Sequence, residues 1–123
     1  MKETNDNIIA FKSKRFALRC IRLYSHLTEA RREFVLSKQL LRSGTSIGAN
    51  VREAIRGQTK PDFGTKMNIA LKEASESEYW LELLSESDYL TVQESESLLT
   101  DCREIIRILT SIVKSTFSDK KSQ

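Results

Sequence analysis

Apolar residues recur at intervals of three and four along most of the chain, which is the period of an amphipathic helix. Four segments carry this pattern, over residues 7–27, 29–56, 61–87 and 92–116. In the third segment the intervals alternate strictly between four and three, from Phe63 and Met67 as far as Leu84. A seam sustained over that length is typical of a helix that packs lengthwise against other helices.

Short segments with turn or capping residues separate the four helices. Thr59 with Asp62, and Thr91 with Glu94, have the spacing of a capping box at a helix start, and we expect Thr28 to cap the second helix. Because the connections are short, consecutive helices must run antiparallel. The pattern predicts an all-α fold, an antiparallel up-down four-helix bundle.

Composition agrees with a single domain over residues 1–123, with a frayed polar tail at 118–123. Four glycines and one proline are too few for the turns that an all-β fold requires. One of these glycines, Gly57, follows the second helix and is expected to end it in the left-handed conformation. The chain contains neither a secretory signal nor an apolar run long enough to cross a membrane. We therefore expect a cytoplasmic protein with no membrane contact, in which Cys20 and Cys102 are reduced.

Catalytic and metal-binding patterns are missing from the sequence. One histidine and two cysteines that are 82 positions apart cannot form a zinc site by themselves. The lone His26 lacks the Glu-x-x-His spacing that di-iron bundles use. We expect no metal, no cofactor and no enzymatic activity.

Charge is distributed unevenly. Residues 1–60 carry 13 basic and 5 acidic side chains, whereas residues 61–123 carry 7 and 12. Basic residues in the first two helices fall on stripes at helical spacing, and we take these as a candidate nucleic-acid-binding surface: Lys12, Arg15, Arg19, Arg22, Lys38, Arg42, Arg52 and Arg56.

Three interpretations of this asymmetry remain open. The basic helices can pair with the acidic ones inside one bundle, where exposed ion pairs contribute about 0–1 kcal/mol each. Basic and acidic faces can instead meet between subunits and close a ring. The basic stripes can also bind nucleic-acid phosphates, in a salt-dependent and weakly sequence-specific way.

The segment Ser43–Asn50 is unusual for the middle of a helix, because two glycines there cost about 1 kcal/mol each relative to alanine. No phosphate-loop spacing is present, so we expect close helix packing together with a buried polar cluster that fixes helix register. The residues assigned to this role are Ser43, Gly44, Ser46, Gly48, Asn50 and Glu53.

Two stretches resemble the four-helix-bundle family of 23S rRNA intervening-sequence proteins. They are QLLRSGTSIGANVREAIRG (Gln39–Gly57) and FGTKMNIALKEASESEYWLELL (Phe63–Leu84). The residues that match the family pattern are Gln39, Arg42, Ser46, Ile47, Asn50 and Glu53, followed by Ala70, Glu73, Glu76 and Leu81.

This resemblance implies a short bacterial protein that assembles as a homopentamer of antiparallel four-helix bundles. A relative, the accessory variability protein of diversity-generating retroelements, implies a basic surface that binds RNA or DNA beside a reverse transcriptase. We therefore expect a non-enzymatic homo-oligomer that binds nucleic acid. The alternative is a protein–protein scaffold whose charges serve only ring assembly.

Overall fold

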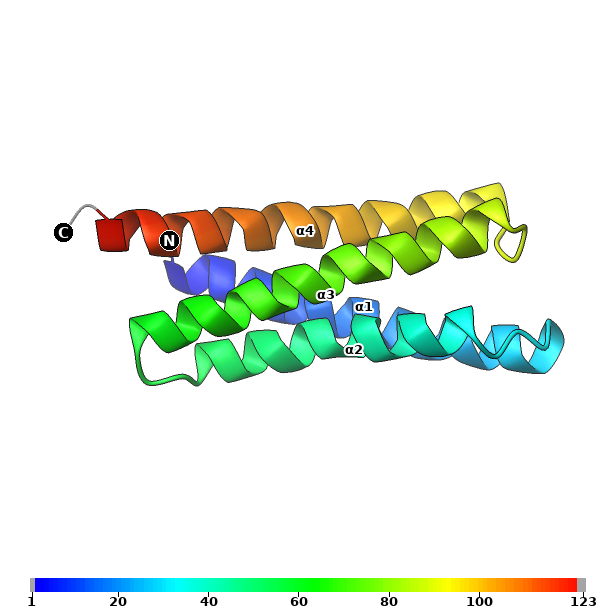
Figure 1. The fold of residues 1–123 in the computed structure, drawn as a ribbon, viewed down its shortest axis with the longest axis horizontal. Helices are drawn as coiled ribbons and strands as arrows, with labels where there is room; N and C mark the ends of the chain where they lie inside the picture. Colours follow the sequence, from blue (N-terminus) through cyan, green and yellow to red (C-terminus); the bar gives the residue numbers. More distant parts are fainter. Residues whose placement is uncertain (1, 122–123) are drawn as a thin grey trace.

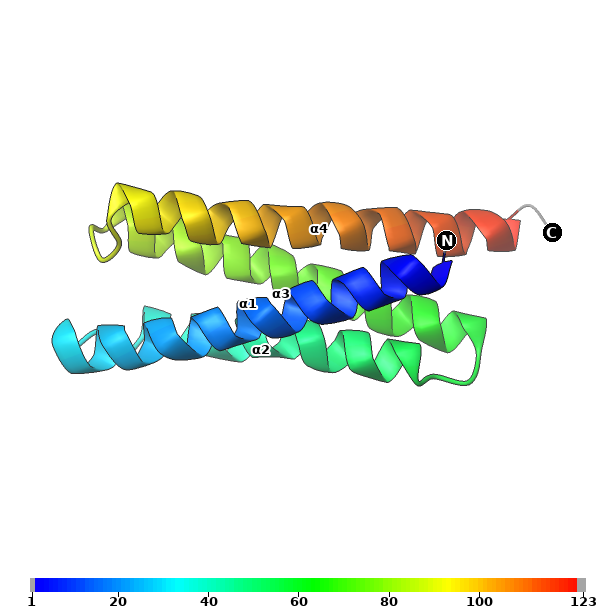
Figure 2. The ribbon, with the colours of Figure 1, turned by 180° about the vertical axis from the view of Figure 1, so that it is seen from behind.

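Four long helices form the structure, a computed structural model that describes residues 2–121. They are α1 (Lys2–Ala30), α2 (Leu36–Ile55), α3 (Lys60–Glu86) and α4 (Val92–Lys121), and no strand occurs among the described residues. Consecutive helices run antiparallel and side by side (Figures 1 and 2). The predicted all-α, up-down four-helix bundle is confirmed.

The predicted apolar seams line the core. Phe16 of α1, Ile47 of α2, Leu81 of α3 and Leu109 of α4 are all fully buried. Phe63, which begins the predicted seam of α3, is half-buried at its edge. Hydrophobic periodicity therefore identified which face of each helix turns inward.

The first connection differs from the prediction. Thr28 does not cap α2, because α1 continues past it and its hydroxyl donates to the Tyr24 carbonyl oxygen at 2.9 Å. The carboxylate of Glu33 caps α2 instead. It accepts hydrogen bonds from the backbone N–H groups of Val35, Leu36 and Ser37, at 3.0, 2.9 and 2.7 Å. These donors would otherwise lack partners at a helix start.

Gly57 is not left-handed, which contradicts the expectation for the end of α2. Space is the constraint there, since a Cβ on Gly57 would lie 2.8 Å from Oδ2 of Asp62 and 3.1 Å from the Ala54 carbonyl oxygen. The left-handed positions are instead Arg32 after α1 and Asp88 after α3, with φ of 55° and 69°.

The helix starts are otherwise set by the predicted caps. Thr91 and Glu94 form a complete capping box, with backbone-to-side-chain distances of 2.8 and 3.1 Å. The Asp62 N–H donates to the Thr59 hydroxyl at 3.2 Å.

The outer ends of the bundle extend beyond the predicted limits. Helix α1 starts at residue 2 instead of about 7, and α4 runs through 118–121, where a frayed tail was expected. Residues 122–123 of that tail lie outside the described residues. The apolar periodicity stops before these polar ends, so it could not indicate helix there.

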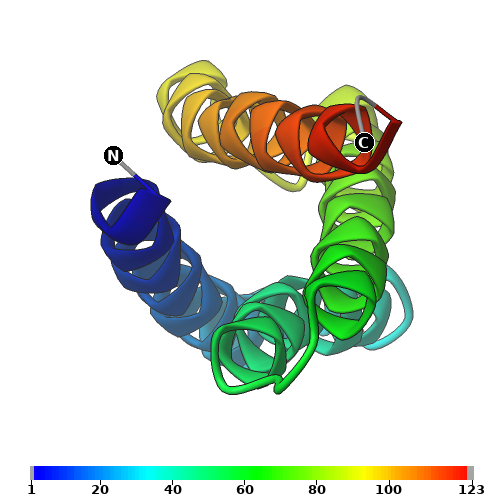
Figure 3. The ribbon, with the colours of Figure 1, turned by 90° about the vertical axis from the view of Figure 1, so that its left-hand side faces the viewer.

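Viewed along its axis, the bundle is an open ring of helices (Figure 3). Each helix packs extensively on the next one along the chain, and the α1–α4 contact that closes the ring is the sparsest. None of the described helices has the length and apolar character needed to cross a membrane.

Candidate functional site

The candidate site is the basic surface of α1 and α2, and ion pairs divide its predicted residues into two groups. Three of the eight are neutralised within the bundle. Lys12 pairs with Glu104 at 3.2 Å, and Arg19 pairs with Asp101 at 2.6 Å. These two pairs tie α1 to α4 across the open side of the ring.

Arg42 is the third neutralised residue, and it joins α2 to α3. Its guanidinium contacts Glu73 at 3.4 Å and also pairs with Glu76, which accepts a hydrogen bond from the Trp80 indole N–H at 3.0 Å. The Trp80 and Arg42 donors lower the pKa of Glu76, and the Glu76 carboxylate raises the pKa of Arg42. The charge of Arg42 is therefore already offset by two carboxylates of α3.

The remaining five predicted residues are exposed and have no acidic partner in the described part of the chain: Arg15, Arg22, Lys38, Arg52 and Arg56. Lys14 shares this property. It was missed because it lies off the stripe that passes through Lys12, Arg15 and Arg19. Contact with acidic neighbours, which sequence spacing does not give, separates the two groups.

A pocket of about 1250 Å³ lies between α1, the second half of α2 and the loop that follows it. We call it the α1–α2 pocket. It is lined in part by small residues of the two facing helices, namely Ala10 and Ala17 of α1 with Gly48 and Ala49 of α2. Because these side chains are short, the two helices leave a hollow between them.

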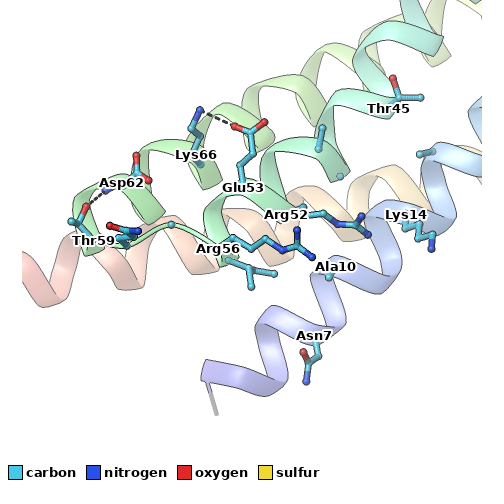
Figure 4. A pocket seen from close by; sticks show the side chains of 16 residues that line it. Asn7, Ala10, Lys14, Thr45, Arg52, Glu53, Arg56, Thr59, Asp62 and Lys66 are labelled. Atoms are coloured by element: carbon cyan, nitrogen blue, oxygen red, sulfur yellow. Dashed lines mark hydrogen bonds and ion pairs between the residues drawn. The ribbon is translucent and has the colours of Figure 1, made fainter.

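Unpaired cations and acidic residues lie on different sides of the α1–α2 pocket. Arg52 and Arg56 extend from α2 toward α1, on which Lys14 lies (Figure 4). On the opposite side Glu53 is bound by Lys66 of α3 at 2.9 Å. That carboxylate raises the pKa of Lys66. The side nearer α1 therefore carries cations without counter-charges.

The segment 43–50 packs closely, as its small residues predicted. A Cβ on Gly44 would lie 2.5 Å from Sγ of Cys20, so α1 and α2 could not approach as they do with a larger residue there. A Cβ on Gly48 would make ordinary contacts with Ser13 at 3.5 and 3.6 Å. Gly44 is the residue that the close approach requires.

The expected buried polar cluster does not form as predicted. Ser46 and Asn50 are half-buried, and each bonds to a backbone carbonyl of its own helix, while Glu53 is exposed. The buried polar contact joins Ser43 of α2 to Ser77 of α3, with the two hydroxyl oxygens 2.8 Å apart. A hydroxyl can satisfy itself on its own helix, so spacing alone did not predict the partners.

The two cysteines are buried and free. Burial raises the pKa of each thiol from 9.0 to about 12, and Glu78 adds to the effect on Cys102. Both thiols are thus protonated at neutral pH, which disfavours nucleophilic chemistry. Among the residues that the structure describes, no group of three or more His, Cys, Asp or Glu side chains could hold a metal ion.

Comparison with known proteins places the chain in a structural context. Residues 5–111 match a family model described as the 23S rRNA-intervening sequence protein. A crystal structure from Bacteroides thetaiotaomicron, of a protein of unknown function from the S23 ribosomal protein family, is similar at 54% sequence identity with a TM-score of 0.87. The match covers 89% of this chain and 98% of that one. No curated protein matches the chain.

Proposed function

The chain belongs to the 23S rRNA-intervening sequence protein family, and from this premise we propose that it is a non-enzymatic, homo-oligomeric bundle that binds RNA or DNA in the cytoplasm. The binding surface is formed by the unpaired cations of α1 and α2. The related crystal structure is of a protein of unknown function, so the proposal rests on the residues of this chain.

The observation that carries the proposal is the concentration of unpaired positive charge on two helices. Six exposed cations of α1 and α2 have no acidic partner among the described residues: Lys14, Arg15, Arg22, Lys38, Arg52 and Arg56. Exposed cations without counter-charges release counterions from a nucleic acid when they contact its phosphates, and this release drives binding.

The lining of the two hollows supports recognition of the backbone rather than the bases. No aromatic residue lines the α1–α2 pocket or the smaller hollow beside Arg15 and Arg22. Aromatic side chains provide the stacking by which proteins grip single-stranded bases, and phosphate contacts carry no sequence information. Binding is therefore proposed to be tolerant of sequence.

Self-association is supported by the outer face of α1. Four large apolar side chains there are 38–65% exposed: Ile8, Phe11, Leu18 and Ile21. Exposed apolar side chains of this kind are available for contact with another protein surface. We propose a homo-oligomer, with five copies as the family resemblance implies. A mass in solution equal to that of one chain would contradict this part.

Fluorescence anisotropy with labelled structured RNA and duplex DNA tests the binding. The wild-type affinity should fall steeply between about 50 and 200 mM salt, as phosphate contacts require. A triple variant (Arg15→Ala, Arg22→Ala and Arg52→Ala) should bind at least tenfold more weakly. The matched control removes three unpaired cations from α3 and α4 instead, by Lys72→Ala, Arg107→Ala and Lys114→Ala.

The outcomes separate the proposal from its alternative. Equal losses in the two triple variants would indicate a general charge effect without a site on α1 and α2. No wild-type binding even at low salt would exclude the proposed function.

The alternative function is a protein–protein scaffold. It is favoured by the same exposed apolar residues of α1 and by the use of Lys12, Arg19 and Arg42 in ion pairs within the bundle. A scaffold predicts that Phe11→Ser disrupts assembly while no nucleic acid binds to the wild type. Size-exclusion chromatography with light scattering measures the first effect.

A further inference from the structure

The α1–α2 pocket has the shape and charge of a site for an anionic chain. At about 1250 Å³ it exceeds the roughly 300–1,000 Å³ of ordinary small-molecule pockets. Lys14 lines it from α1, and Arg52 and Arg56 line it from the end of α2; none of the three has an acidic partner among the described residues. Positive charge thus faces a hollow that has room for more than a single small anion.

The spacing of the cations suits consecutive negative charges. Arg52 in the last turn of α2 and Arg56, the C-cap residue of that helix, lie four residues apart, a rise of about 6 Å along the chain. Both side chains extend across the hollow toward α1 (Figure 4). Successive phosphates of an extended strand can span this distance, and the short side chains of Ala10 and Ala17, which line the pocket, leave the backbone of that strand room to enter.

We propose that the α1–α2 pocket binds the phosphodiester backbone of a single nucleic-acid strand, with its bases directed toward solvent. The inference rests on the proposed function and identifies both the place and the class of nucleic acid. A duplex presents its phosphates on a wide convex surface, whereas a single strand can follow a concave hollow between two helices.

The acidic residues of the pocket are compatible with this arrangement. Lys66 binds the Glu53 carboxylate at 2.9 Å, and Asp62 lies on the same side, beside Gly57. Repulsion from these groups directs a strand to the side nearer α1, where the unpaired cations lie. Glu53→Gln removes part of this repulsion and should therefore not weaken binding.

The experiment compares two double variants by fluorescence anisotropy with a labelled single-stranded RNA of mixed sequence and with the corresponding duplex. The pocket variant is Arg52→Ala with Arg56→Ala. The control is Lys72→Ala with Lys114→Ala, which removes the same charge from α3 and α4. Circular dichroism verifies that both remain helical.

The pocket variant should bind the single strand at least tenfold more weakly than wild type. The slope of log K against log salt concentration should become less steep by about 1.4, which corresponds to the loss of two phosphate contacts. The control should bind as wild type does, and the duplex should bind more weakly than the single strand.

Several results would overturn the inference. They are an unchanged affinity in the pocket variant, a duplex bound as tightly as the single strand, or displacement of the strand by equimolar tripolyphosphate or poly-glutamate. In each of these cases the proposed function still stands if the wild type binds nucleic acid. Absence of any wild-type binding would instead exclude both.

Discussion

Glu33 controls the start of α2 through one buried carboxylate. Burial alone would raise its pKa, but the hydrogen bonds from Leu36, Ser37 and Val35 outweigh burial and lower the pKa below the ordinary 4.5. The carboxylate therefore stabilises the fold in its ionised form. This stabilisation is fully present above pH 4.5 and is lost as the pH falls through the lowered value.

Glu33→Gln should destabilise the protein by about 1 kcal/mol at pH 7, the usual cost of losing a helix cap. Urea unfolding at several pH values measures the effect. The difference between variant and wild type should shrink as the pH falls below 4.5, because the wild-type carboxylate is then protonated as well. A constant difference down to pH 2.5 would contradict the role of the charge.

Gly44 and Gly48 of α2 contact α1 in different ways. Gly44 lets Cys20 of α1 approach the backbone of α2, whereas a Cβ on Gly48 would make only ordinary contacts with Ser13, and Gly48 also lines the α1–α2 pocket. Two glycines in one helix thus have different roles: close packing requires Gly44, whereas Gly48 lies beside the pocket and has room for a small side chain.

Gly44→Ala should destabilise the protein by about 1–3 kcal/mol, because its Cβ overlaps Sγ of Cys20. Gly48→Ala is the matched control, and it should stabilise the helix by up to about 1 kcal/mol, since alanine has the higher helix propensity. Adding Cys20→Ala to Gly44→Ala should recover part of the loss. Thermal unfolding measures all three variants, and equal effects of the two glycine substitutions would disprove the distinction.

The sequence predicts elements better than it predicts the site. Burial repeats with the helical period, so the inward faces of all four helices follow from spacing. The partner of each cation depends on the helix that packs beside it. Arg15 and Arg19 share a stripe, yet only Arg19 forms an ion pair with Asp101 of α4. Glu33 was not predicted to cap α2, because glutamate is not among the residue types that usually cap a helix start.

The resemblance to the family depends on residues that hold helices together. Arg42 pairs with Glu73 and Glu76 across α2 and α3, and Glu53 pairs with Lys66. These contacts hold α2 against α3. They also explain why the resemblance by itself does not assign the binding surface.

The molecule as a whole encloses its two thiols. Cys20 on α1 and Cys102 on α4 are 1% and 0% exposed, and burial keeps each protonated. A folded-state pKa of about 12, raised from 9.0, means that both stabilise the fold below pH 9.0. This contribution is lost as the pH rises from 9.0 toward 12.

At pH 8, both thiols of the native protein should react with a disulfide reagent much more slowly than the thiols of the unfolded protein. Both should react at once in concentrated urea. In the native state they should react at similar slow rates, because exposure of either one requires the bundle to open. Rapid modification of one native thiol would show that α1 or α4 detaches alone.

Each extensively packed pair of helices in this bundle is also a consecutive pair in the chain. Contact order is therefore low, and bundles of this kind fold in microseconds to milliseconds. Three helical hairpins can form in any order at little entropic expense. Closure of α1 on α4 must bring together segments from opposite ends of the chain. We therefore expect the salt bridges of Lys12 and Arg19 with α4 to form last during folding.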